Sequence, residues 1–159
     1  MDYRKEYEKW LASPALSEDE RAELKALEGN DKEIKARFYG PLEFGTAGLR
    51  GTMYTGLHNM NRHVIRWATQ GFANVIRAEG TEAMQKGVAV CMDCRNHSAE
   101  FARETACVMA ANGIHVRLFE SLRPTPELSF AVREYGCQAG VNVTASHNPK
   151  EYNLSLIHI

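Results

Sequence analysis

Between residues 88 and 144, three short apolar runs alternate with two amphipathic runs, and this order constrains the fold more than any other feature of the sequence. The apolar runs Val88–Met92, Ile114–Phe119 and Gly140–Thr144 predict strands. Apolar residues at helical spacing lie between them, around Phe101–Met109 and Leu128–Tyr135. Strands that are linked through helices pair in parallel, so the sequence predicts an α/β domain.

The first forty residues are charged and have helical patterns. Ser17 and Glu20 form a capping box, which predicts the start of a helix, and Gly29 is expected to end that helix. We therefore expect residues 1–40 to form a helical N-terminal extension.

A longer helix is predicted after Asn61, which is a suitable N-cap. Apolar residues recur at helical spacing from Val64 to Ile76, and we expect the aromatic residues Trp67 and Phe72 to lie in the core. The preceding segment 44–51 is rich in glycine, so we expect it to be a functional loop.

Charge and composition narrow the class of protein. Apolar residues make up 44% of the chain and charged residues 25%, which is typical of a globular protein. The formal net charge is -1, so no overall field favours nucleic acid or an anionic membrane. The charged N-terminus lacks the apolar run of a signal peptide, and we expect a cytoplasmic protein with reduced cysteines.

Polar residues follow two of the predicted strands. Asp93 comes directly after the first strand, and Ser146 and His147 follow the third. Open α/β sheets bind ligands beyond the carboxyl ends of their strands, so both clusters should meet at one edge. Ser146 is the candidate reactive hydroxyl at this edge, and the alternative is that it only caps backbone groups in a turn.

Three segments resemble the α-D-phosphohexomutase superfamily in the expected order. Thr144–Asn153 is similar to its phosphoserine loop, Phe44–Gly51 to its first conserved loop, and Arg123–Arg133 to its helix-entry segment. Further similarities extend the match over nearly all of residues 40 to 153. The resemblance implies an α/β/α domain with a mixed, largely parallel sheet, in which residues 41–153 form domain I, the phosphoserine domain.

The resemblance also implies a reaction. In that family, phosphoserine donates its phosphoryl group to a sugar phosphate, and the resulting bisphosphate reorients and returns its other phosphoryl group. Ser146 would be that serine, with a hexose 1,6-bisphosphate as intermediate and activator. The partner would be a small sugar phosphate, with glucose 1-phosphate converted to glucose 6-phosphate. Phosphomannomutase and phosphopentomutase activities remain alternatives, and the oligomeric state stays open.

Further site residues follow from the same resemblance. Arg50 would bind the phosphoryl oxygens, which its planar donors suit, and Thr46 would add a hydroxyl donor; the alternative for Arg50 is a solvated or salt-bridged side chain. His147 would shuttle a proton or orient the serine loop, and we favour orientation. Arg95 would lie near the substrate, or would form a structural ion pair with Asp93.

Metal binding has two interpretations. In the family, Mg²⁺ is held by the phosphate on the serine, here Ser146, and by three aspartates of a later Asp-x-Asp-x-Asp loop. No such loop occurs in this chain, nor do the sugar-recognition and C-terminal phosphate-binding domains, so we expect the fragment alone to be inactive. The alternative from a different class is a non-catalytic phosphate- or metal-binding module, or a thiol-redox site, built on Cys91, Cys94 and His97.

Residues 154–159 depart from the family pattern. The family continues with glycine after Asn153 and then a lysine near the phosphoryl group, whereas this chain reads Leu-Ser-Leu-Ile-His-Ile. This hexapeptide resembles the translation of a transposon-end adapter used in sequencing libraries, so we expect a non-native tail. The alternative is a genuine short strand with alternating apolar residues.

Overall fold

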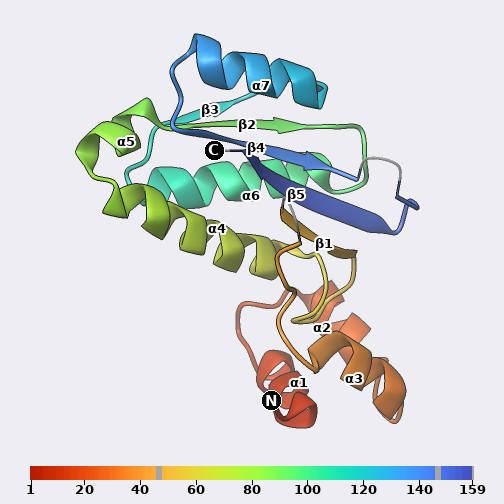
Figure 1. Cartoon of the computed structure of the whole chain (residues 1–159). Coiled ribbons are helices and arrows are strands. Elements are labelled where there is room, and N and C mark those ends of the chain that lie inside the picture. Colours follow the sequence, from red (N-terminus) through yellow and green to blue (C-terminus); the bar gives the residue numbers. More distant parts are fainter. Residues whose placement is uncertain (46–47, 146–147, 159) are drawn as a thin grey trace.

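Five strands form one sheet in the computed structural model, which describes residues 1–45, 48–145 and 148–158 (Figure 1). The order across the sheet is β1-β5-β4-β2-β3. The strands span β1 Gly48–Thr52, β2 Val88–Met92, β3 Val116–Leu118, β4 Ala139–Thr144 and β5 Tyr152–His158.

Strand direction agrees with the predicted fold class. Strand β2 pairs in parallel with β3 and β4, while β5 runs antiparallel to β4 and to β1. Strands β1 to β4 therefore all point the same way, and β5 alone among the described strands is reversed. This confirms an α/β/α domain with a mixed, largely parallel sheet.

Helices cover both faces of the sheet (Figure 1). One face packs its valines, such as Val88 and Val90, against α4 (Arg62–Ala78) and α6 (Ser98–Ala111). The other face places Ala89 and Cys91 against Leu128 of α7 (Thr125–Glu134). The alternation of side chains along β2 thus supplies both layers of the core. The short helix α5 (Thr81–Lys86) joins α4 to β2. Within the described residues, no helix is both long and apolar enough to cross a membrane.

The N-terminal region is helical, as predicted. It consists of α1 (Tyr3–Leu11), α2 (Glu18–Lys25) and α3 (Asp31–Phe38), which lie beside the β1 end of the sheet (Figure 1). The three helices enclose a small apolar cluster of their own, which Leu57 of the following domain completes. Arg37, which is buried, adds ion pairs to Glu23 and Glu33 and stacks over the Tyr54 ring.

Helix starts follow the predicted caps more closely than helix ends do. The capping box of Ser17 and Glu20 is present, and both of its hydrogen bonds form. The prediction that Gly29 ends this helix was wrong, because α2 stops at Lys25 and a turn intervenes. Gly29 instead has a φ of +83° in that turn, a value that glycine adopts without strain.

Helix α4 starts at the predicted N-cap, Asn61. The Asn61 side chain accepts hydrogen bonds from the backbone N–H groups of His63 and Val64. The expected core position is confirmed for Phe72, which is 8% exposed, and was wrong for Trp67, which is 59% exposed. The apolar stripe of α4 is wider than the face that is buried. Periodicity alone therefore did not distinguish the buried Phe72 from the exposed Trp67.

The glycine-rich segment 44–51 contains a strand that we had expected to be a loop. Its second half begins β1, which pairs with β5 and places Gly48 opposite Leu156. A Cβ atom on Gly48 would lie 1.9 Å from the carbonyl oxygen of Ser155, so the strands approach here at a distance that requires glycine. Glycine therefore permits this strand rather than breaking it.

Strand β5 includes most of the segment that we had expected to be a non-native tail. It lies inside the sheet, between β1 and β4. This geometry corresponds to the alternative of a short strand. The origin of residues 154–159 stays a prediction, which the genomic DNA downstream of the Asn153 codon can test.

Candidate functional site

The candidate site lies at the carboxyl ends of β2 and β4, which are neighbours in the sheet. Asp93 directly follows β2, and Ala145 directly follows β4. The two polar clusters meet at one edge, because the backbone N–H of Asp93 donates to the carbonyl of Val143 at 3.1 Å. The polar clusters thus meet at the predicted edge of the sheet, and the role of this edge as a functional site stays a prediction.

Asp93 is the centre of this edge. Its Oδ1 accepts from the backbone N–H of Arg95 and from the hydroxyl of Ser98, both at 2.9 Å. Its Oδ2 accepts from the hydroxyl of Thr144 at 2.6 Å and from the backbone N–H of Ala145 at 3.3 Å. One carboxylate thus joins the start of α6 to the end of β4.

These contacts also set the charge of Asp93. Burial raises the pKa of its carboxyl group, but the hydrogen bonds from Thr144, Arg95, Ser98 and Ala145 lower it by more. The pKa therefore lies below its ordinary value, and Asp93 is a carboxylate at neutral pH.

A second buried group continues the network. Asn153, which is fully buried, donates through its side-chain amide to the carbonyl of Asn96 at 2.9 Å and to the Ser98 hydroxyl oxygen at 3.2 Å. Ser98 is also fully buried and donates to Asp93. We had not predicted roles for Ser98 or Asn153, although both lie in segments similar to the family. Ser98 is the first residue of α6 and Asn153 lies within β5, so neither stands directly beside the end of a predicted strand, and the local pattern gave no signal for them.

Asn148 holds the backbone on the far side of Ala145. Its backbone N–H and its side-chain amide both donate to the Ala145 carbonyl, each at 2.9 Å. Both polar backbone groups of Ala145 are thus hydrogen-bonded, one to Asp93 and one to Asn148. The residue that precedes Ser146 in the sequence therefore has a defined place.

Three of the predicted site residues, Thr46, Ser146 and His147, lie outside the described residues. Their roles stay predictions. Ala145 and Asn148, the described residues on either side of the undescribed pair, lie at the expected edge.

Arg50 lies on β1 and is exposed. It is in register with Leu154 of β5, which is in register with Thr144 of β4. Residues in one row of a sheet project from the same face, so Arg50 and Thr144 share a face two strands apart, or about 10 Å. Within the described part of the chain, Arg50 forms no ion pair. A cation is therefore available on the face that Arg50 shares with Thr144.

Arg95 is half-buried and lies in the turn between β2 and α6. It contacts Asp93 through its backbone N–H at 2.9 Å. Its proximity to the site agrees with the expectation, and its role in binding substrate stays a prediction.

The thiols and histidine of the alternative metal site do not converge. Cys91 is buried, donates to Asn142 Oδ1 at 3.1 Å, and has a pKa raised by burial to about 12, so it is a poor source of thiolate. Cys94 is exposed, because it lies beyond the end of β2. Among residues 1–45, 48–145 and 148–158, no group of three His, Cys, Asp or Glu side chains could hold a metal ion.

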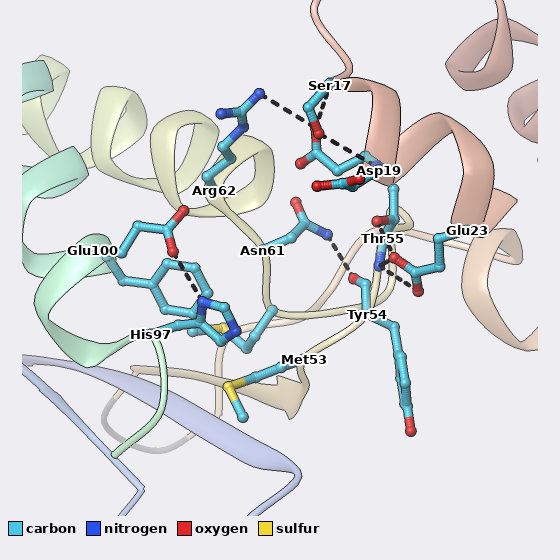
Figure 2. Close-up of a pocket in the computed structure, with 13 residues that line it drawn as sticks. Ser17, Asp19, Glu23, Met53, Tyr54, Thr55, Asn61, Arg62, His97 and Glu100 are labelled. Atoms are coloured by element: carbon cyan, nitrogen blue, oxygen red, sulfur yellow. Dashed lines mark hydrogen bonds and ion pairs between the residues drawn. The ribbon is translucent and has the colours of Figure 1, made fainter. Parts of the chain in front are cut away.

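His97 faces a different cavity, of about 310 Å³, between α2 and the starts of α4 and α6 (Figure 2). Its Nδ1 lies 2.9 Å from Glu100 Oε2. On the opposite wall, the Thr55 hydroxyl donates a hydrogen bond to the carboxylate of Glu23 (Figure 2). The nearby Arg62 forms an ion pair with Glu20. The cavity marks the seam between the N-terminal helices and the sheet domain, and its lining includes neither Asp93 nor Arg50.

Comparison with known proteins gives one family. Residues 41–158 match the family model described as phosphoglucomutase/phosphomannomutase, alpha/beta/alpha domain I. The match begins just after the three N-terminal helices and includes all of the described strands.

Individual relatives give the same result. A phosphopentomutase of Pongo abelii is 40% identical over 132 residues, which cover 79% of this chain and 22% of the relative. A phosphoglucomutase of Staphylococcus saprophyticus is 41% identical over 123 residues, covering 77% of this chain and 22% of the relative.

A solved structure also resembles the chain. A candidate phosphomannomutase from Thermus thermophilus superposes with a TM-score of 0.67 at 31% identity, and the match covers 75% of this chain and 26% of that one. The chain thus spans about a fifth to a quarter of the length of the proteins it matches.

Proposed function

Because the chain belongs to the phosphoglucomutase/phosphomannomutase family, whose α/β/α domain I it matches, we propose that it carries the phosphoserine of a phosphosugar mutase, at Ser146. In the first step, the P–O bond to the Ser146 oxygen breaks and a new P–O bond forms to a hydroxyl of the sugar phosphate. After the bisphosphate reorients, its other phosphoryl group returns to the Ser146 oxygen. The net reaction is an isomerisation.

The observation that carries the proposal is the hydrogen-bonded position of Ala145. Asp93 and Asn148 hold its N–H and its carbonyl at the carboxyl end of β4, directly before Ser146. Phosphoryl transfer depends mainly on positioning and on charge stabilisation, and a fixed strand end supports the first of these.

Charge stabilisation is assigned to Arg50. It is an exposed guanidinium on the face that it shares with Thr144, and its planar donors suit phosphoryl oxygens. We assign Thr46 and Arg95 to phosphate binding and His147 to orienting the serine loop. These assignments rest on the family motifs in which the residues lie.

The proposed substrate is a hexose phosphate, with glucose 1-phosphate and glucose 6-phosphate as the pair and a hexose 1,6-bisphosphate as intermediate. Pentose phosphate is the second candidate, because a relative named phosphopentomutase is as similar as one named phosphoglucomutase. A phosphomannomutase activity has the support of the structural relative. Purified complete protein, assayed with all three substrate pairs, separates these candidates.

Mg²⁺ is the proposed metal cofactor, and the described residues of this chain form no metal site by themselves. The phosphate on Ser146 would supply one ligand, and the described residues contain no cluster of three possible side-chain ligands. The remaining ligands would come from outside this chain. When bound, the ion would neutralise charge on the phosphoryl oxygens.

The proposed organisation is an N-terminal extension over residues 1–40, domain I over 41–153 and a tail over 154–159. We propose a cytoplasmic enzyme that acts on a small sugar phosphate and binds neither nucleic acid nor membrane. The near-neutral formal charge of the chain supports the last part.

The Ser146→Ala variant of the complete protein tests the proposal. The change removes the oxygen that accepts and returns the phosphoryl group, so turnover should collapse while the fold is kept. Peptide mass mapping should find phosphate on Ser146 in the unchanged protein and none in the variant. Ser121→Ala, at an exposed serine of a loop, is the control and should retain full turnover. Wild-type turnover by folded Ser146→Ala protein would exclude the phosphoserine role.

A further inference from the structure

The segment that carries Ser146 is hydrogen-bonded at both of its ends to the same turn, residues 93–97 between β2 and α6. We propose that Asp93 and Asn153, bridged by Ser98, are positioning residues that fix the Ser146 segment for phosphoryl transfer. This inference rests on the proposed function of Ser146. It assigns no contact with the substrate to any of the three.

The N-terminal end of the segment is held by Asp93. Oδ2 of its carboxylate accepts from the side chain of Thr144 and from the backbone of Ala145, at 2.6 and 3.3 Å. Ala145 is fully buried, so water cannot replace Asp93 as the acceptor for its N–H. The contact thus fixes the backbone one residue before Ser146.

The C-terminal end is held by Asn153. Its side chain donates to the Asn96 carbonyl and to the Ser98 hydroxyl, and its Oδ1 accepts from the N–H of Leu154 at 2.7 Å. Asn153 has no exposed surface, so its amide is fully committed to these partners. Residues 145 and 153, the two ends of the segment, are therefore both hydrogen-bonded to the turn between β2 and α6.

Ser98 joins the two ends. Its hydroxyl donates to Asp93 Oδ1 at 2.9 Å and accepts from the Asn153 amide at 3.2 Å. A continuous chain of hydrogen bonds therefore runs from Ala145 through Asp93 and Ser98 to Asn153. Ala145, Ser98 and Asn153 are fully buried and Asp93 is half-buried, so water competes little for these hydrogen bonds and they support one another.

Ionised Asp93 cannot be replaced by its neutral amide without loss. Two donors face each carboxylate oxygen, and an asparagine would turn an NH₂ group toward one of these pairs. A hydroxyl can rotate to accept from that NH₂, but the N–H of Ala145 or Arg95 cannot. One backbone N–H would therefore lose its acceptor, and the strand end or the turn would shift.

The primary test is Asp93→Asn in the complete protein. Single-turnover experiments with phosphorylated enzyme would measure phosphoryl transfer from Ser146 to glucose 1-phosphate. We expect this rate and kcat to fall on the order of a hundredfold, with little change in KM, because a small displacement of a reacting group has an effect of this size. Amide hydrogen exchange in peptides covering residues 148–153 should become faster, and that readout does not require activity.

Two further variants support the interpretation. Glu100→Gln removes a carboxylate from the first turn of α6, where it contacts His97 and, among the described residues, none of the 145–153 segment. It should leave the transfer rate and the exchange unchanged. Ser98→Ala removes the bridge but leaves three of the four hydrogen bonds to Asp93. It should slow transfer by about tenfold and raise exchange in 148–153, even if Asp93→Asn does not fold.

The outcomes distinguish this inference from the proposed function. Absence of phosphate on Ser146 in active, unchanged protein would reject the proposed function, whatever the variants do. If Ser146 is phosphorylated, and folded Asp93→Asn and Ser98→Ala proteins transfer phosphate at the wild-type rate, the positioning role is overturned. A loss of stability with an unchanged transfer rate per folded molecule would also overturn it, since that is the result of a structural role alone.

Discussion

Among the described residues, Arg50 is a cation without an ion pair, and it lies on the face of the sheet that it shares with Thr144. An unpaired surface arginine contributes little to folding, so its removal isolates its chemical role. In the complete protein we expect Arg50→Ala to lower kcat on the order of a hundredfold, because one preorganised donor to developing charge is worth about that much. Steady-state kinetics on the folded variant would measure this.

A second exposed arginine provides the control. Arg103 lies on α6, on the solvent side, and Arg103→Ala should leave kcat within about twofold. Arg50→Lys should recover part of the loss, since lysine keeps the charge but not the planar donor pair. Equal rates for Arg50→Ala and Arg103→Ala would assign Arg50 to the solvated surface.

At the scale of the element, the Asn61 side chain both caps α4 and holds the loop that precedes it. Asn61 accepts from His63 and Val64 as a cap, and its amide donates to the carbonyls of Tyr54, Gly56 and Asn59. Asn61→Ala should therefore lower the free energy of unfolding by about 1 kcal/mol for the cap, and by about 1–2 kcal/mol more for carbonyls left without a donor. Urea unfolding of this chain, followed by circular dichroism, measures both contributions together.

Asn30 is the matched control at the same scale. It is the N-cap of α3, it is exposed, and its side chain accepts from Glu33 alone among the residues the structure describes. Asn30→Ala should lower the unfolding free energy by about 1 kcal/mol, which is the capping contribution alone. An equal effect of the two substitutions would mean that the inward hydrogen bonds of Asn61 contribute nothing.

At the scale of the whole molecule, the chain is expected to lack parts that the mutase reaction requires. The chain spans 22% of the length of its curated relatives and includes no cluster of three metal-binding side chains within the described residues. We expect the 159-residue chain to convert no glucose 1-phosphate above background in a coupled assay, because phosphoryl transfer requires charge neutralisation on all sides of the phosphate. The complete protein, assayed in parallel, is the positive control. Conversion by the chain alone that is lost in Ser146→Ala would contradict this expectation.

The N-terminal helices are a folded part of the same molecule. Leu57 completes their apolar cluster, and Arg37 bridges Glu23 of α2 to the Thr55 carbonyl. Both contacts reach the loop that precedes α4, and through Asn61 that loop is bound to the start of α4. The extension is thereby connected to the sheet domain, although it lies outside the family match.

The sequence alone determined the elements whose signals are local. Strand β2 has the predicted bounds, and the caps Ser17 and Asn61 start the predicted helices. The edge with Asp93 followed from the order of strands and helices, since parallel strands end on one side. The family, too, could be identified from motifs that are continuous in the chain.

Only the tertiary structure decided the features that depend on distant partners. It made a strand of β1, because Gly48 lies against Ser155, and it left Trp67 exposed, because nothing among the described residues covers that side of α4. It also joined Asp93 to Thr144 and Ser98 to Asn153, pairs that are 51 and 55 residues apart. Local pattern reports which residues favour a helix or a strand, whereas a buried hydrogen bond forms only where the packed sheet brings two chain segments together and excludes water.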